Sequence, residues 1–109
     1  MVPQKALGEF KGRMKIFHGT EDEELRRILY ASFLALQSAC GKFSWDNERG
    51  KELVFERSRY VYNDYLEFFN ENFVSELVSF GMDLGIMGAD AQPPESSRVG
   101  GNMGLKVIG

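Results

Sequence analysis

No charged residue occurs between Ile28 and Gly41, and this uncharged stretch most constrains what the chain can fold into. A membrane-spanning helix needs about 20 apolar residues, so the stretch is predicted to be a buried helix of a globular protein. Thr20 and Glu23 have the spacing of a capping box at its start, and Gly41 is suited to end it. Between them one apolar face repeats at helical spacing, through Leu25, Ile28, Leu29, Ser32, Phe33, Leu36 and Cys40. The pattern predicts a helix over residues 21–40.

The opposite face of this helix also lacks charge. Tyr30 and Leu34 lie far from the main apolar face, among the small residues Ala31, Ala35 and Ser38. A helix on a protein surface normally carries charged residues on its outward face. We therefore expect this helix to be covered on more than one side, by the rest of the chain or by a second copy.

A second long helix is predicted over residues 64–84. Its apolar residues recur every three or four positions, at Leu66, Phe69, Phe73, Leu77, Phe80 and Leu84. Asn63 is a suitable N-cap, and Asp64 and Glu67 favour the positive end of the helix dipole. If the helix continued towards the N-terminus, the apolar residues there would no longer lie on one face, so a break is expected near Tyr62 and Asn63.

The segment between the two helices allows two interpretations. Residues 51–57 are mostly good helix formers, which favours a shorter helix over 47–59. Apolar and polar residues alternate on both sides of a turn-like segment at 46–50, which instead predicts a hairpin over 43–57. We prefer the helix because β-branched residues are few.

The fold expected from these elements is mainly α, with two long antiparallel helices and a shorter helix. The alternative is an α+β fold with a hairpin over 43–57 between the two long helices. Residues 1–19 are expected to form an N-terminal arm or a short strand near Met14, which is also a candidate start of the chain. Residues 20–86 form the single helical domain. Residues 87–109 are rich in Gly and Pro and are expected to be a flexible tail.

Charge is distributed unevenly along the chain, whose formal net charge is −3. Residues 1–59 are slightly basic, whereas residues 60–97 contain no Lys or Arg. The simpler interpretation is that the two oppositely charged parts attract each other within the fold or across a dimer, and the functional one is an acidic face for a basic partner. Nucleic-acid-binding proteins show clustered Lys and Arg, so the acidic segment argues against nucleic acid. The remaining nucleic-acid alternative is binding through the basic and aromatic residues of 42–62.

The sequence contains no grouping that predicts catalysis, a cofactor or a metal. His18 is the only histidine, and Cys40 lies on the predicted buried face. Asp64, Glu67 and Glu71 share a face of the second helix and have the chemistry to hold a hard cation, although a solvated acidic face is the simpler interpretation. We expect a non-enzymatic protein without cofactors. One cysteine excludes an intrachain disulfide, and no signal or membrane segment is evident, so a cytoplasmic location is expected.

Phe68 is the aromatic residue that best marks a function. On the helical wheel it lies between Asp64 and Glu71, opposite the predicted core face. Large apolar side chains on a polar face often mark a contact with a partner. The predicted function is an interaction or regulatory module acting as a homodimer, with a basic protein as a further partner and Phe68, Asp64, Glu67, Glu71, Tyr30 and Leu34 as interface residues. The alternative is a small-ligand binder with an aromatic pocket between the helices.

Overall fold

The computed structural model describes residues 1–85, and within them the chain is mainly helical, with no strand. In chain order the elements are α1 (Gln4–Met14), α2 (Asp22–Cys40), α3 (Glu48–Tyr62), the short 3₁₀ helix η1 (Leu66–Phe68) and α4 (Phe69–Asp83). The expected mainly helical class is therefore confirmed for this part of the chain. The predicted tail, 87–109, lies outside the described residues.

The first predicted helix is confirmed as α2, with its apolar face buried in the core. Its N-terminus differs from the expectation, because Thr20 does not cap it. The Thr20 hydroxyl instead lies 2.8 Å from Nδ1 of His18. Glu21 occupies the cap position without a side-chain hydrogen bond, and three acidic residues in the first turn face the positive end of the dipole. Gly41 ends the helix with φ 121°, a conformation that favours glycine.

The segment after α2 is a helix, so the hairpin alternative is wrong. Asn47 is the N-cap of α3, and its Oδ1 accepts a hydrogen bond of 2.9 Å from the backbone N–H of Gly50. This bond satisfies one of the amides that a helix start leaves without a partner. Leu53, Val54 and Phe55 are all buried, because α3 is in contact with neighbours on several sides.

The N-terminal segment forms a helix, and the short strand expected near Met14 is absent. Lys15 adopts a left-handed conformation (φ 60°) and ends α1, and the N–H of Ile16 bonds back to the carbonyl of Lys11 at 2.9 Å. The residues near Met14 that were expected to form a strand are the end of this helix followed by a turn. Leu7 and Phe10 are fully buried, so α1 is part of the core rather than a free arm.

Residues 64–84 do not form the single helix that was expected. The predicted break is present, because α3 ends at Tyr62. Asn63, however, is the C-cap of α3 and not the N-cap of the next helix. Asp64 has φ 68°, so it lies in a turn ahead of η1, and α4 begins only at Phe69. Phe73 adds a kink within α4 (φ −119°, ψ 17°).

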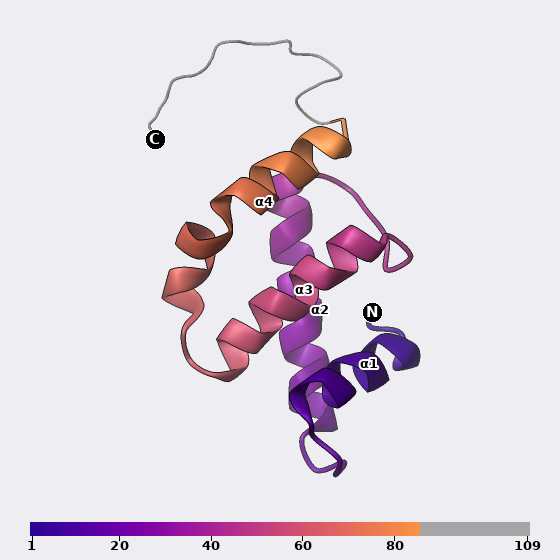
Figure 1. The fold of residues 1–109 in the computed structure, drawn as a ribbon. Coiled ribbons are helices and arrows are strands. Elements are labelled where there is room, and N and C mark those ends of the chain that lie inside the picture. The colour runs from indigo at the N-terminus through magenta and orange to yellow at the C-terminus, as the bar shows by residue number, and fades with distance from the viewer. Residues whose placement is uncertain (86–109) are drawn as a thin grey trace.

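The helices are arranged around α2, which contacts each of the other three. Figure 1 shows α3 crossing α2, with α1 lying towards the start of α2 and α4 towards its end. The most extensive contact of α2 is with α3, so the expected antiparallel pairing of the two long segments is not the main packing. At the α2–α3 contact, the guanidinium of Arg57 donates to the hydroxyl of the fully buried Ser32 at 3.1 Å.

Candidate interaction site

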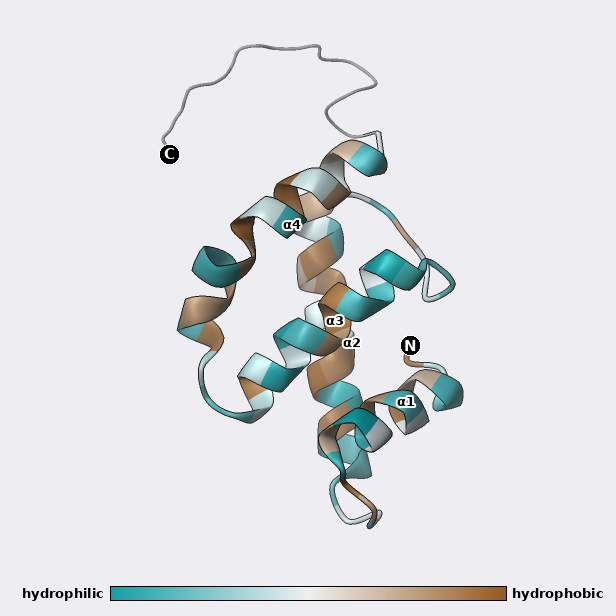
Figure 2. Ribbon diagram, in the orientation of Figure 1, coloured by the Kyte–Doolittle hydropathy of each residue, from teal (hydrophilic) through white to brown (hydrophobic). Residues whose placement is uncertain are grey.

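The residues predicted to form an acidic, aromatic-containing face come together where α3 turns into α4. Phe68 is 47% exposed and Tyr65 is 58% exposed, with their ring centroids 6.4 Å apart. Asp64, Glu67 and Glu71 are exposed in the same short segment. We call residues 64–71 the elbow face. Figure 2 shows hydrophobic and hydrophilic residues interleaved along η1 and the first turns of α4.

The carboxylates of the elbow face have no basic partners among residues 1–85. Within residues 1–85, Asp64, Glu67 and Glu71 form no ion pair, and the same is true of Glu76 further along α4. The three carboxylates do not share one helical face, because Asp64 lies in the turn, Glu67 in η1 and Glu71 in the first turn of α4. They therefore lie along the same short segment as the exposed rings rather than forming a stripe on one helix.

A pocket of about 400 Å³ lies beside these rings, between α3, η1 and α4. Its lining residues are Arg59, Tyr60, Asn63, Tyr65, Phe68 and Asn72. The Tyr60 ring packs edge-on against Phe69 and Phe73, at centroid distances of 5.6 and 5.7 Å, which connects the pocket wall to the core. The Tyr60 hydroxyl accepts a hydrogen bond of 3.0 Å from Nδ2 of Asn72, so α3 and α4 are also joined across the pocket.

Arg59 is the only charged residue in the pocket lining. Its guanidinium lies 5.3 Å from the centre of the Tyr60 ring, a cation–π distance. Its Nη2 also donates to Oε1 of Glu56 at 2.6 Å. The positive charge is therefore already paired outside the pocket, while the flat guanidinium contributes to the pocket wall.

The turn into the elbow face stores backbone strain. Asp64 is one of two non-glycine residues with positive φ within residues 1–85. The amide of Asp64 donates to Val61, and that of Tyr65 donates to Tyr60, at 3.1 and 2.8 Å. A left-handed conformation is costly for a residue with a side chain and persists where surrounding contacts enforce it, often at functional sites.

Tyr30 and Leu34 lie together on the outward face of α2 and form a second surface. They are 41% and 45% exposed, and Ala31 and Ser38 on the same face are exposed as well. The described residues do not cover this face, although coverage on more than one side was expected. Tyr30 and Leu34 lie on α2 and Phe68 lies in η1, two elements that make no extensive contact with each other, so we treat them as separate surfaces.

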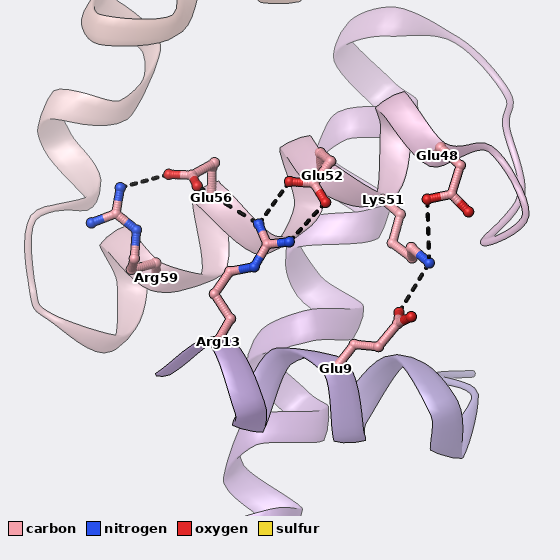
Figure 3. A network of polar contacts seen from close by, with 7 residues as sticks. All are labelled: Glu9, Arg13, Glu48, Lys51, Glu52, Glu56 and Arg59. Carbon is pink, nitrogen blue, oxygen red and sulfur yellow. Dashed lines mark hydrogen bonds and ion pairs between the residues drawn. The ribbon is translucent and has the colours of Figure 1, made fainter. Parts of the chain in front are cut away.

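Charged residues of α1 and α3 form a network of ion pairs and hydrogen bonds, shown in Figure 3. Arg13 donates to both carboxylate oxygens of Glu52, at 2.7 and 2.8 Å, and Lys51 lies 2.9 Å from Glu9. The hydrogen bonds from Arg13 lower the pKa of Glu52. Each charge in this group has an opposite partner, so its role is to attach α1 to the body of the protein.

The described residues offer neither a candidate metal cluster nor an accessible thiol. No group of three His, Cys, Asp or Glu within residues 1–85 is placed to hold a metal ion. Cys40 is buried, and burial raises the pKa of its thiol, which makes it a poor nucleophile. In this part of the chain no helix combines the length and the apolar character that crossing a membrane requires.

Sequence reasoning missed part of the pocket. Phe68 was predicted as an interface residue and Asn63 only as a helix cap, while Arg59 and Asn72 were not assigned to a pocket. Asn72 of α4 meets the end of α3 only through tertiary packing. The available signal was the density of rings at Tyr60, Tyr62, Tyr65, Phe68 and Phe69.

Comparison with known proteins gives no assignment. No known protein family matches the chain, and neither the curated proteins nor the solved structures contain a match. A functional proposal therefore depends on the geometry of the surfaces described above.

Proposed function

We propose that the chain is a non-enzymatic protein-interaction module that acts as a homodimer and presents the elbow face to a basic protein partner. The observation that carries the proposal is the composition of that face. Two exposed rings, Tyr65 and Phe68, lie in the same short segment as exposed carboxylates that form no ion pair within the described part of the chain. Aromatic anchors within a charged rim are typical of protein interfaces.

The charge of the elbow face favours a basic partner over other partners. No Lys or Arg occurs from Tyr60 to Ser97, so nothing in this segment offsets the negative field around Phe68. Complementary charge speeds the encounter of two proteins and disfavours acidic competitors. Nucleic acid is a poor alternative, because the cations of α3 are already engaged: Arg49 pairs with Asp83, Lys51 with Glu9 and Arg59 with Glu56, while Arg57 is directed to Ser32.

The outward face of α2 supports self-association. In a twofold dimer the same patch meets itself, so charged residues on it would place like charges together. The stretch from Ile28 to Gly41 has no charge, and Ala31 and Ser38 are small enough to let a second helix approach closely. Tyr30 and Leu34 supply exposed apolar surface for that contact.

A small-ligand binder is the second candidate. The observation in its favour is the pocket of about 400 Å³ at the elbow, which is within the usual size range for ligand sites.

A cytoplasmic location belongs to the same proposal. Cys40 is the only cysteine of the chain and is a free, buried thiol. Free thiols without disulfides are the rule in reducing compartments.

The homodimer is tested by light scattering on a sizing column, with loaded concentration varied over two orders of magnitude. We expect wild type to have twice the 12.4 kDa chain mass and Leu34→Asp to have the monomer mass. Phe68→Asp is the matched control, because it makes the same chemical change on the other surface and should remain dimeric. A monomeric wild type at every concentration contradicts the proposal, as does a dimeric Leu34→Asp variant with native helicity.

A further inference from the structure

We infer that the pocket at the elbow receives an aromatic side chain of the basic partner, most suitably Trp, while cations on either side of that side chain bind the carboxylates of the elbow face. The inference rests on the proposed function and names the chemistry of the partner segment. It assigns separate roles to the pocket and to its acidic surroundings.

The walls of the pocket fit a flat ring. Tyr60, Tyr65 and Phe68 contribute three rings, and the Arg59 guanidinium already lies against the Tyr60 ring. A further ring can pack edge-on or offset against these groups, contacts worth about 0.5–1.5 kcal/mol beyond apolar burial. The contacts of Tyr60 with Phe69, Phe73 and Asn72 hold its ring in place before any ligand binds, which reduces the entropic cost of binding.

The polar atoms of the pocket favour a ring with a hydrogen-bonding edge. Asn63 and Asn72 each have an amide oxygen able to accept a hydrogen bond, and an indole N–H is a donor. The Tyr60 hydroxyl accepts from Asn72, so its own proton remains available to a backbone carbonyl of the bound segment. Phe would use the rings but leave these groups without partners.

The positions of the charged residues indicate that the aromatic residue and the basic residues of the partner segment bind at different places. No carboxylate lines the pocket, so a Lys or Arg side chain would have no ion-pair partner inside it. Asp64 precedes Tyr65 and Glu67 precedes Phe68 in the chain, so two exposed carboxylate residues are direct neighbours of residues that line the pocket. The complementary segment is therefore an aromatic residue with basic residues as immediate neighbours.

Three short peptides with blocked ends test the two parts separately: Lys-Trp-Lys, Lys-Ala-Lys and Glu-Trp-Glu. Each is titrated into the full-length protein at low salt, and binding is followed by the NMR amide shifts of residues 59–72. We expect Lys-Trp-Lys to bind at least about tenfold tighter than Lys-Ala-Lys, because truncating an anchoring side chain at an interface to Ala typically weakens binding by this much. Equal affinities of these two, or no binding of either, overturn the pocket inference. If Glu-Trp-Glu instead binds as tightly as Lys-Trp-Lys, the preference for a basic partner fails while the pocket inference stands.

Two matched variants show whether the difference arises in the pocket. Phe68→Ala removes one wall, and Val78→Ala is the control, because Val78 lies on α4 outside the pocket and is 48% exposed against 47% for Phe68. Phe68→Ala should abolish the difference between Lys-Trp-Lys and Lys-Ala-Lys, and Val78→Ala should preserve it. Circular dichroism checks that both variants remain folded. A Phe68→Ala protein that still distinguishes the peptides contradicts the inference.

Discussion

Replacement of Gly50 by Ala should destabilise the protein, although Ala is the better helix former. Gly50 lies in the first turn of α3, and an added Cβ would lie 2.5 and 2.6 Å from Cδ2 and Cε2 of Phe43 and 3.0 Å from Cζ of Phe80. Carbon atoms pack at about 3.5–4.0 Å, so the Phe43 ring would have to move by about 1 Å. It has little freedom to do so, because Phe33 and Phe80 both pack edge-on against it, at centroid distances of 5.1 and 5.2 Å.

The size of the effect follows from two opposing contributions. An extra methyl group in a close-packed core costs about 1–3 kcal/mol. Ala in place of Gly in a helix recovers up to about 1 kcal/mol. We therefore expect the free energy of unfolding to fall by about 1–2 kcal/mol, with a Tm lower by several degrees.

Urea denaturation followed by circular dichroism measures this change. Gly12→Ala is the matched control, because Gly12 lies in α1 and a Cβ there meets nothing within 4 Å, so stability should rise by about 0.5–1 kcal/mol. In a Phe43→Leu background the cost of Gly50→Ala should shrink, because the side chain it collides with is smaller. The packing argument is refuted if Gly50→Ala is as stable as wild type, or if its cost is the same in both backgrounds.

Three further changes have effects that can be measured in the same way. Leu7→Ala should lower the free energy of unfolding by about 2–5 kcal/mol, because Leu7 is fully buried; an unchanged urea midpoint would show that α1 is not docked. Asn47→Ala should cost about 1 kcal/mol by removing the cap of α3, whereas Asn47→Asp should retain most of the stability. Glu52→Gln should cost up to about 1 kcal/mol at neutral pH, since the Arg13–Glu52 pair is largely exposed. Because Arg13 lowers the pKa of Glu52 in the folded state, this stabilisation is present above the ordinary carboxyl pKa and is lost as the pH falls through the folded-state pKa. Urea titrations at neutral and strongly acidic pH should show the Glu52→Gln difference disappearing in acid, and a difference of equal size at both pH values would contradict it.

Local patterns were sufficient to predict α2 and the presence of α3. The apolar repeat of α2 and the helix-forming composition of α3 act within a few turns, so they do not depend on distant contacts. The helix α1 was not predicted, although the sequence contains a signal for it. Leu7, Phe10 and Met14 have helical spacing, and Pro3 precedes the first turn. The short strand expected near Met14 was preferred to a helix with this spacing.

The structure of the elbow face could not be predicted from a single helical wheel, because it depends on contacts between α3 and α4. The apolar repeat over 64–84 predicted that a helix begins at Asp64. In the structure Tyr60 packs against Phe69 and Phe73, and Asp64 lies in a turn with left-handed backbone conformation. The exposure of Phe68 agrees with the helical wheel of the predicted 64–84 helix, although Phe68 lies in η1, ahead of α4. The pocket beside it could not be predicted, since Arg59 and Asn72 come from helices whose relative position is set by tertiary packing.

The single thiol of the chain lies at the contact between α2 and α4. The Cys40 S–H donates to the backbone carbonyl of Leu77 at 3.5 Å, and Cys40 is only 2% exposed. A thiol reagent therefore reaches Cys40 only after α4 separates from the end of α2 or the whole protein unfolds. The dependence of the labelling rate on urea distinguishes these two openings, because a local opening exposes less surface than global unfolding. Cys40 is thus a built-in probe of how firmly α4 is held in the native protein, and a peptide that bridges α3 and α4 at the elbow should slow its labelling.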